Sequence, residues 1–231
     1  MENLIYILFV CITIPLALMA CLIDKKPRRI VIFFIIGICS AVFASEVNGI
    51  LTYLIPLDVF DFTVRVTPIT EEIIKAIPVL FFAKEISNKK ETLITVSLAV
   101  GIGFAVMENT YILTQNIEYV SMLWAIMRGF GTGIMHGMCT FLVGTGFSFA
   151  NRNKKLFVVG TFALLSLAIT YHSVFNMLVQ SDLRYVGASL PIVTYVPFVL
   201  LVYKNRKKRS INIKIINHRR FYRLIIPTFK I

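Results

Sequence analysis

The feature that most constrains the fold of this chain is a series of apolar segments, separated by short polar stretches. A helix rises 1.5 Å per residue, so about twenty apolar residues cross a hydrocarbon core of about 30 Å. Hydrophobic residues make up 57% of the 231 residues and charged residues only 16%, a balance that excludes an ordinary water-soluble domain. The sequence therefore predicts an all-α polytopic membrane protein, a bundle of about seven transmembrane helices.

The order of the spans and the basic clusters predicts the topology. The expected spans are residues 4–23, 30–57, 68–84, 92–113, 124–149, 156–179 and 186–203. Lys and Arg cluster after the first, third, fifth and seventh spans, as they do in cytoplasmic loops. This places the N-terminus outside and the C-terminus in the cytoplasm, and it explains the net charge of +12 without a nucleic-acid partner. We expect residues 1–203 to form the bundle and residues 204–231 a basic cytoplasmic tail against anionic lipid.

Ionisable side chains interrupt several of these apolar spans. They are Glu71, Glu72 and Lys75 in the third span, then Glu108, His136 and His172 in the next three. A charge inside a bilayer is costly unless it is paired or used, so such residues indicate a functional site. With alternating spans and 1.5 Å per residue, the glutamates and histidines all fall in the outer half of the bilayer. We therefore expect them to meet in the folded bundle.

This set of residues suits the activation of water. Two histidines and a carboxylate are a common zinc set that leaves a position for water, and a second carboxylate can serve as general base. Lys75 is expected to pair with Glu71 or Glu72. Other interpretations stay open at this point: His136 could make a structural hydrogen bond between helices, and so could His172 with Asn176. Buried Glu and His also build proton relays in transporters.

Four motifs on successive spans carry a resemblance to a known family. They are Glu71-Glu72-x-x-Lys75, Gly103-Phe104-Ala105-x-x-Glu108-Asn109, His136, and His172-x-x-x-Asn176. Together they resemble the PrsW family of intramembrane proteases over residues 67–180, the motif-bearing core of the predicted bundle. The related type II CAAX prenyl endopeptidases typically have Arg and His where this chain has Lys75 and Glu108, which favours the PrsW branch. PrsW proteins tend to have Asp where this chain has Asn176.

The resemblance implies a membrane-embedded metalloendopeptidase, with zinc as its cofactor, in the multi-pass arrangement of a bacterial inner-membrane protein. It implies site-1 cleavage of a single-span anti-sigma factor on its extracytoplasmic side, in a stress response. The predicted catalytic residues are Glu71, Glu72, Glu108, His172 and Asn176; the predicted metal ligands are Glu108, His136 and His172; and Lys75 is the predicted charge partner. Two alternatives share the superfamily. One is a CAAX-type prenyl-protein endopeptidase, whose site would face inward, and the other is a non-catalytic scaffold like the Aph-1 subunit of γ-secretase.

Overall fold

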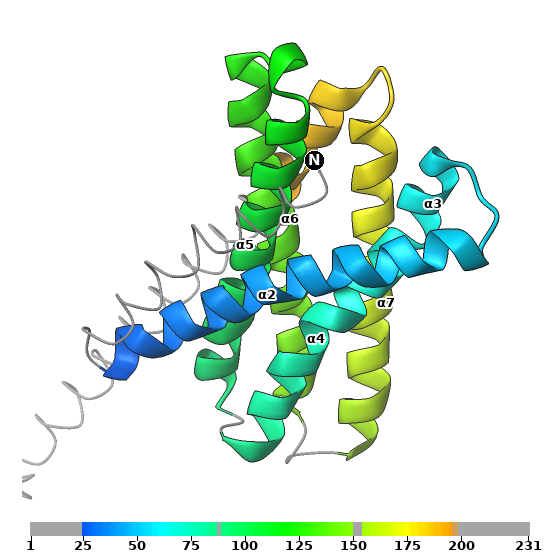
Figure 1. Ribbon diagram of the computed structural model, residues 1–231. Coiled ribbons are helices and arrows are strands. Elements are labelled where there is room, and N and C mark those ends of the chain that lie inside the picture. Colours follow the sequence, from blue (N-terminus) through cyan, green and yellow to red (C-terminus); the bar gives the residue numbers. More distant parts are fainter. Residues whose placement is uncertain (1–24, 87–88, 150–153, 196, 198–231) are drawn as a thin grey trace, which may run out of the picture. The chain divides into compact units, whose positions relative to one another are not determined.

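The computed structural model describes residues 25–86, 89–149, 154–195 and 197, and every regular element within them is a helix (Figure 1). The long helices are α2 (Lys25–Leu54), α4 (Thr67–Glu85), α5 (Lys90–Gln115), α6 (Met122–Phe147) and α7 (Lys154–Val179). A short helix, α3 (Val59–Arg65), and a 3-10 turn, η1 (Ile117–Tyr119), lie between them, and residues 184–195 are also helical. The described part of the chain is therefore all-α, as predicted.

The helix boundaries follow the predicted spans closely. Helix α4 begins at Thr67 with Pro68 in its first turn, where the missing N–H of proline would have no partner anyway. Among the described residues, three helices are long and apolar enough to cross a membrane: Pro27–Leu54, Lys90–Gln115 and Phe157–Val179. The predicted span 4–23, the end of the span 186–203 and the tail 204–231 lie outside the described residues. The count of seven spans and the sidedness of the two ends therefore stay predictions.

The acidic connection between α2 and α4 folds into a helix, α3, that the sequence analysis did not predict. Asp58 caps it, because its Oδ1 accepts a hydrogen bond from the backbone N–H of Asp61 at 2.8 Å. Asp61 in turn pairs with Arg65 one turn later, at 3.2 Å. Two turns of helix are too short to show a hydrophobic period. The hydroxyl of Thr63 in α3 donates a hydrogen bond to Oε1 of Gln180, the residue after α7, at 2.8 Å. This bond holds α3 beside the end of α7.

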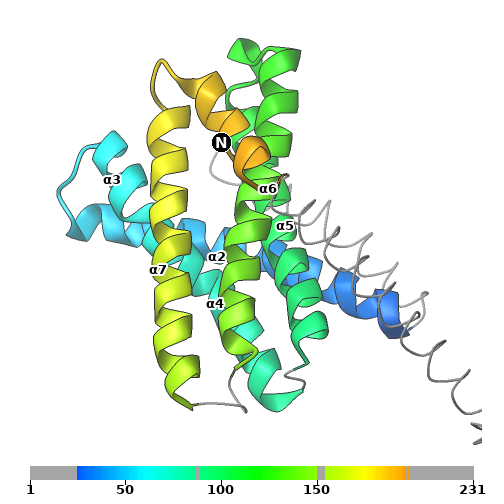
Figure 2. The same cartoon turned by 180° about the vertical axis from the view of Figure 1, so that it is seen from behind.

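Glycines bring α5 close to its neighbours. Helix α5 packs against α2, α4 and α6, and α6 packs against α4, α5 and α7 (Figure 2). A Cβ on Gly101 would overlap the backbone of His136, and a Cβ on Gly103 would overlap the backbone of Phe34. Small residues at such positions let two helix backbones approach. Glycines of both helices lie at the contact of α5 with α6, because a Cβ on Gly144 of α6 would overlap the side chain of Ser97.

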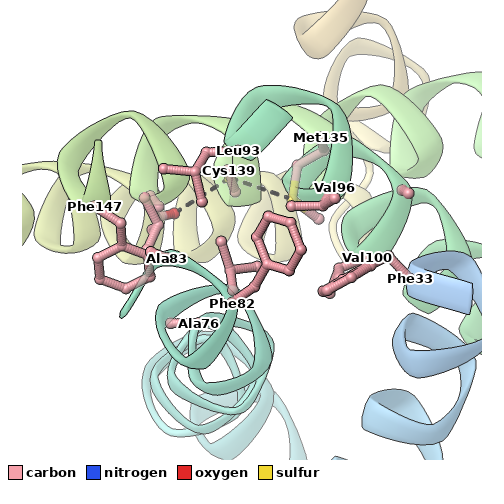
Figure 3. Close-up of a cluster of buried hydrophobic side chains, with 14 of the residues drawn as sticks. Phe33, Ala76, Phe82, Ala83, Leu93, Val96, Val100, Met135, Cys139 and Phe147 are labelled. Carbon is pink, nitrogen blue, oxygen red and sulfur yellow. Dashed lines mark hydrogen bonds between the residues drawn. The ribbon is translucent and has the colours of Figure 1, made fainter. Parts of the chain in front are cut away.

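An apolar cluster, which we call the apolar core, fills the bundle between the second halves of α4 and α6 and the first half of α5 (Figure 3). Its members include Phe33, Phe82, Leu93, Val100, Cys139 and Phe147. The rings of Phe33 and Phe82 meet edge to face with their centroids 5.0 Å apart. The core reaches Ala76 on α4, so it begins directly after Lys75.

Candidate functional site

Side chains from four helices meet beside the apolar core. They are Glu71, Glu72 and Lys75 of α4, Glu108 of α5, His136 of α6 and His172 of α7, and we call them the polar cluster. All are buried except Glu108, whose side chain is 21% exposed. The structure thus brings together the ionisable side chains that interrupt the four apolar spans.

Lys75 links two of the helices. Its side chain is fully buried, and its Nζ lies 2.6 Å from Oε1 of Glu72 and 2.6 Å from Nδ1 of His136. Nζ also lies 4.6 Å from the centroid of the Phe104 ring, a cation–π contact. Of the two predicted charge partners, Glu72 is therefore the one that Lys75 contacts. An ammonium group can only donate hydrogen bonds, so Nδ1 of His136 accepts one and its ring hydrogen lies on Nε2.

The two histidines each have a carboxylate partner. Nε2 of His136 lies 2.6 Å from Oε2 of Glu108, and Nδ1 of His172 lies 2.9 Å from Oε1 of Glu72. The two rings stand nearly perpendicular, with their centroids 4.8 Å apart. Nε2 of His172 lies 3.7 Å from Oε2 of Glu71, beyond hydrogen-bond distance. A hydrogen bond through Nδ1 that leaves Nε2 available is the arrangement by which a carboxylate orients a metal-binding histidine.

Arg128 of α6, which was not among the predicted site residues, also belongs to the site. It is buried, and its Nη2 donates a hydrogen bond to Oε1 of Glu108 at 3.1 Å. Arg128, Thr132 and His136 are spaced four residues apart, so they share one face of α6, and all three are buried. The sequence did contain a signal for Arg128, because it lies two helical turns before His136 and therefore on the same face of the helix.

The donor atoms of the cluster fit a metal ion. One ligand atom each from Glu71, His136 and His172 lie within 4.8 Å of one another, and this set of one carboxylate and two histidines is a common zinc set. Oε2 of Glu71 is buried and has no hydrogen-bond partner among the described residues, which is costly unless something else occupies that side. The predicted ligand set contained Glu108 in place of Glu71. In the structure Glu108 instead contacts His136 and Arg128.

A cavity of about 750 Å³ opens beside the polar cluster. Glu71, Glu108 and Arg128 form part of its wall, so a molecule in the cavity can reach these three charged side chains. Asn176 also lines the cavity, but its Nδ2 donates to the backbone carbonyl of Thr63 in α3 at 3.0 Å. Among the described residues it makes no hydrogen bond to the polar cluster. The predicted catalytic asparagine thus lies in the cavity wall rather than within the cluster.

The family model described as PrsW family intramembrane metalloprotease matches residues 25–202. The match includes every residue of the polar cluster, together with Arg128 and Asn176. No curated protein matches the chain, and no solved structure does.

Proposed function

Since the matched residues make up most of its length, the chain belongs to the PrsW family intramembrane metalloproteases and is a membrane-embedded protease, and we propose that it cleaves single-span membrane proteins near their extracytoplasmic side. The observation that carries the proposal is Glu71. Its carboxylate is buried, lines the cavity and has an oxygen without a hydrogen-bond partner among the described residues, next to two histidines. A carboxylate in this position can take a proton from a water molecule that attacks a peptide bond.

The charge pattern supports the extracytoplasmic position. Glu71 lies in the second turn of α4, and His172 lies about two turns before the end of α7. The basic residues Lys84, Lys89 and Lys90 lie at the opposite end of α4 and at the start of α5. Because cytoplasmic loops carry the excess of Lys and Arg, the polar cluster belongs nearer the outer face. The seven-span topology, with the N-terminus outside, is part of this proposal.

His136, His172 and one of the two cavity carboxylates would hold the metal. When bound, a divalent ion such as zinc supplies a Lewis acid and lowers the pKa of water at the site toward neutrality. Nδ1 of His136 accepts from Lys75 and its Nε2 contacts Glu108, so metal binding at this ring requires one of the two bonds to open. Glu108 is the partner that lines the cavity, whereas Lys75 is fully buried.

We assign the proton transfer to Glu71, which leaves Glu108 as the metal carboxylate, in agreement with the predicted ligand set. The desolvated and unpartnered oxygen of Glu71 favours the basic role, while Glu108 is already held by Arg128 and His136. The short distances between the ligand atoms of Glu71, His136 and His172 support the opposite assignment, with Glu71 as metal ligand and Glu108 as base. Metal content distinguishes the two: on our assignment Glu108→Gln loses the metal and Glu71→Gln keeps it.

The other polar residues hold these groups in place. Glu72 accepts from Lys75 and contacts Nδ1 of His172, so it orients the histidine rather than reaching the substrate. Arg128 holds Glu108 at the cavity wall. Asn176 uses one amide hydrogen on Thr63 and has a second, which would donate to the oxyanion that forms when water adds to the peptide carbonyl.

The substrate that the family resemblance favours is a single-span anti-sigma factor, cut in the first step of a stress response in a bacterial inner membrane. The test is cleavage of a dye-labelled single-span protein by the full-length enzyme in liposomes. Glu71→Gln should slow cleavage by roughly 10²-fold or more, the usual size of a general-base effect. The matched control is Glu118→Gln in the exposed turn η1. Mass spectrometry should place the cut in the outer half of the span. Equal rates for the two variants would contradict the proposal.

A further inference from the structure

A hollow of about 520 Å³, which we call the α5 hollow, lies between the start of α2 and the first turns of α5. Its wall includes Arg29 of α2 and Glu91, Thr92 and Thr95 of α5. The side chain of Arg29 is exposed, and its Cζ lies 5.6 Å from the centroid of the Phe82 ring. It makes no hydrogen bond or ion pair among the described residues, so its guanidinium donors are available to a ligand.

A second hollow, of about 280 Å³, shares Arg29 with the first, and we call it the α4 hollow. The rest of its wall consists of one more arginine and four apolar side chains: Arg28, Ile32, Phe33, Phe82 and Ile86. Phe33 and Phe82 are also members of the apolar core, as Figure 3 shows, so the α4 hollow lies against that core. A cationic group beside an apolar hollow matches a ligand that carries an anionic group next to a hydrocarbon chain.

The charges around the two hollows are mainly positive. The wall residues and their immediate neighbours are residues 27–30 of α2, 84–86 at the end of α4 and 89–92 at the start of α5, and they include five basic and two acidic residues. Basic pockets between transmembrane helices bind anionic lipid headgroups. Glu91 is the acidic residue in the wall, and its carboxylate can accept hydrogen bonds from headgroup hydroxyls.

We propose that the two hollows form one binding site for an anionic phospholipid such as phosphatidylglycerol. Arg29 holds the phosphate, the glycerol headgroup enters the α5 hollow, and an acyl chain lies in the α4 hollow. A guanidinium group suits this role because its paired donors match two phosphate oxygens. Inorganic phosphate has no chain to fill the α4 hollow, so the ligand is a lipid. The site is separate from the proposed function, since neither hollow is lined by a residue of the polar cluster.

The test is native mass spectrometry of delipidated full-length protein in detergent, titrated with phosphatidylglycerol, phosphatidylethanolamine or phosphatidylcholine with identical acyl chains. The measured quantity is the binding constant of the first lipid. We expect phosphatidylglycerol to bind at least about fivefold more tightly than phosphatidylcholine, the factor that corresponds to about 1 kcal/mol for one basic residue near anionic lipid. Phosphatidylethanolamine should bind like phosphatidylcholine, and excess inorganic phosphate should not displace phosphatidylglycerol.

Arg29→Gln tests the guanidinium and should remove the preference for phosphatidylglycerol. Lys84→Gln is the matched control, because it removes the same charge from an exposed side chain at the end of α4 that lines neither hollow. The preference should persist in this control. Arg29→Lys keeps the charge but loses the paired donors, so it should retain only part of the preference.

Ile86→Ala tests the contact with the acyl chain. Ile86 and Ile77 are 60% and 59% exposed, but only Ile86 lines the α4 hollow, so Ile77→Ala is the matched control. We expect Ile86→Ala to weaken binding of the first phosphatidylglycerol about threefold through lost apolar contact. Ile77→Ala should leave this binding constant unchanged.

Three results would overturn the proposal. Equal loss of preference in Arg29→Gln and Lys84→Gln would show that the lipid responds to net charge and not to a site. Equal binding of phosphatidylglycerol and phosphatidylethanolamine would show that no anion is selected, and displacement by inorganic phosphate would show an anion site without a lipid. None of these measurements uses cleavage, so a negative result leaves the proposed function untouched.

Discussion

The same helices build two regions with opposite chemistry, the polar cluster and the apolar core. Helix α4 carries Glu71 to Lys75 in its first half and Phe82 in its second. Helix α6 carries Arg128 and His136 first and Cys139 to Phe147 afterwards. The apolar core is stabilised by the packing of complementary side chains, as in the edge-to-face contact of Phe33 and Phe82. The polar cluster is held by specific pairs, such as Lys75 with Glu72 and His136 with Glu108, while Glu71 has no hydrogen-bond partner among the described residues.

This difference predicts different responses to mutation. A side chain lost from the apolar core leaves a cavity, and its neighbours keep their own contacts. A side chain lost from the polar cluster leaves a buried partner without compensation, and that partner is a group the reaction needs. Substitutions in the core should therefore affect stability with little effect on the activity of folded molecules, whereas substitutions in the cluster should affect both.

The largest effect is expected from Lys75→Met. Its loss leaves Glu72 as an uncompensated buried charge, which should lower the free energy of unfolding by about 3–5 kcal/mol. Denaturation of the purified protein in detergent measures this. The double variant Glu72→Leu/Lys75→Met removes the charge as well, so it should regain more than half of the lost stability while cleavage stays absent. A double variant as unstable as Lys75→Met would contradict the importance of the ion pair.

Phe82→Ala should lower stability by about 3 kcal/mol through the cavity that it creates in the apolar core. Cleavage per folded molecule, measured below the unfolding transition, should stay at the wild-type value because Phe82 contacts Phe33 and Arg29, near the opposite end of α4 from Glu71. Phe82→Leu keeps most of the volume and serves as the control. A cleavage rate that falls in parallel with stability would show that the two regions are not separable.

Gly101→Ala should disturb the polar cluster from outside it. The added Cβ overlaps the backbone of His136, so α5 and α6 must move apart, at a cost of about 1–3 kcal/mol and with loss of cleavage. Gly137→Ala is the matched control at the same contact, because the nearest atoms to its Cβ belong to the side chains of Ile102 at 3.4 Å and Leu98 at 3.7 Å. Thermal unfolding and cleavage rates of the pair should differ clearly. Equal behaviour would mean that this close approach is not needed.

The smallest effect is expected at Gly133, where an added Cβ meets no atom within 4 Å. Gly133→Ala should stabilise α6 by about 0.5–1 kcal/mol through helix propensity alone, with unchanged cleavage. A destabilisation at this position would reveal a packing partner for this face of α6 that lies outside the described residues or on another molecule.

Much of the fold could be predicted because the signals are local. The length of each apolar segment predicts a transmembrane span. An ionisable residue inside such a segment can be recognised from the sequence without knowledge of its neighbours in space. The different surroundings of Glu71, which lines the cavity, and Glu72, which pairs with Lys75 and His172, could not be predicted, because they depend on how far α4 is rotated about its axis. Arg128 was not among the predicted site residues, because its partner Glu108 lies on another helix and the sequence does not show the pair. Helix α3 depends on a cap at Asp58 within a stretch that is too short to show periodicity.

The central claim is that the polar cluster holds a metal and hydrolyses peptide bonds, and metal content measured beside cleavage tests it most directly. The chain has three histidines, of which His136 and His172 lie in the cluster and His218 lies in the basic tail. Full-length wild-type protein and His218→Gln should both contain about one equivalent of metal and cleave a single-span substrate, because three protein ligands are enough for a catalytic site. His172→Gln should lose both. Metal content and cleavage in His172→Gln equal to those of His218→Gln would contradict the account.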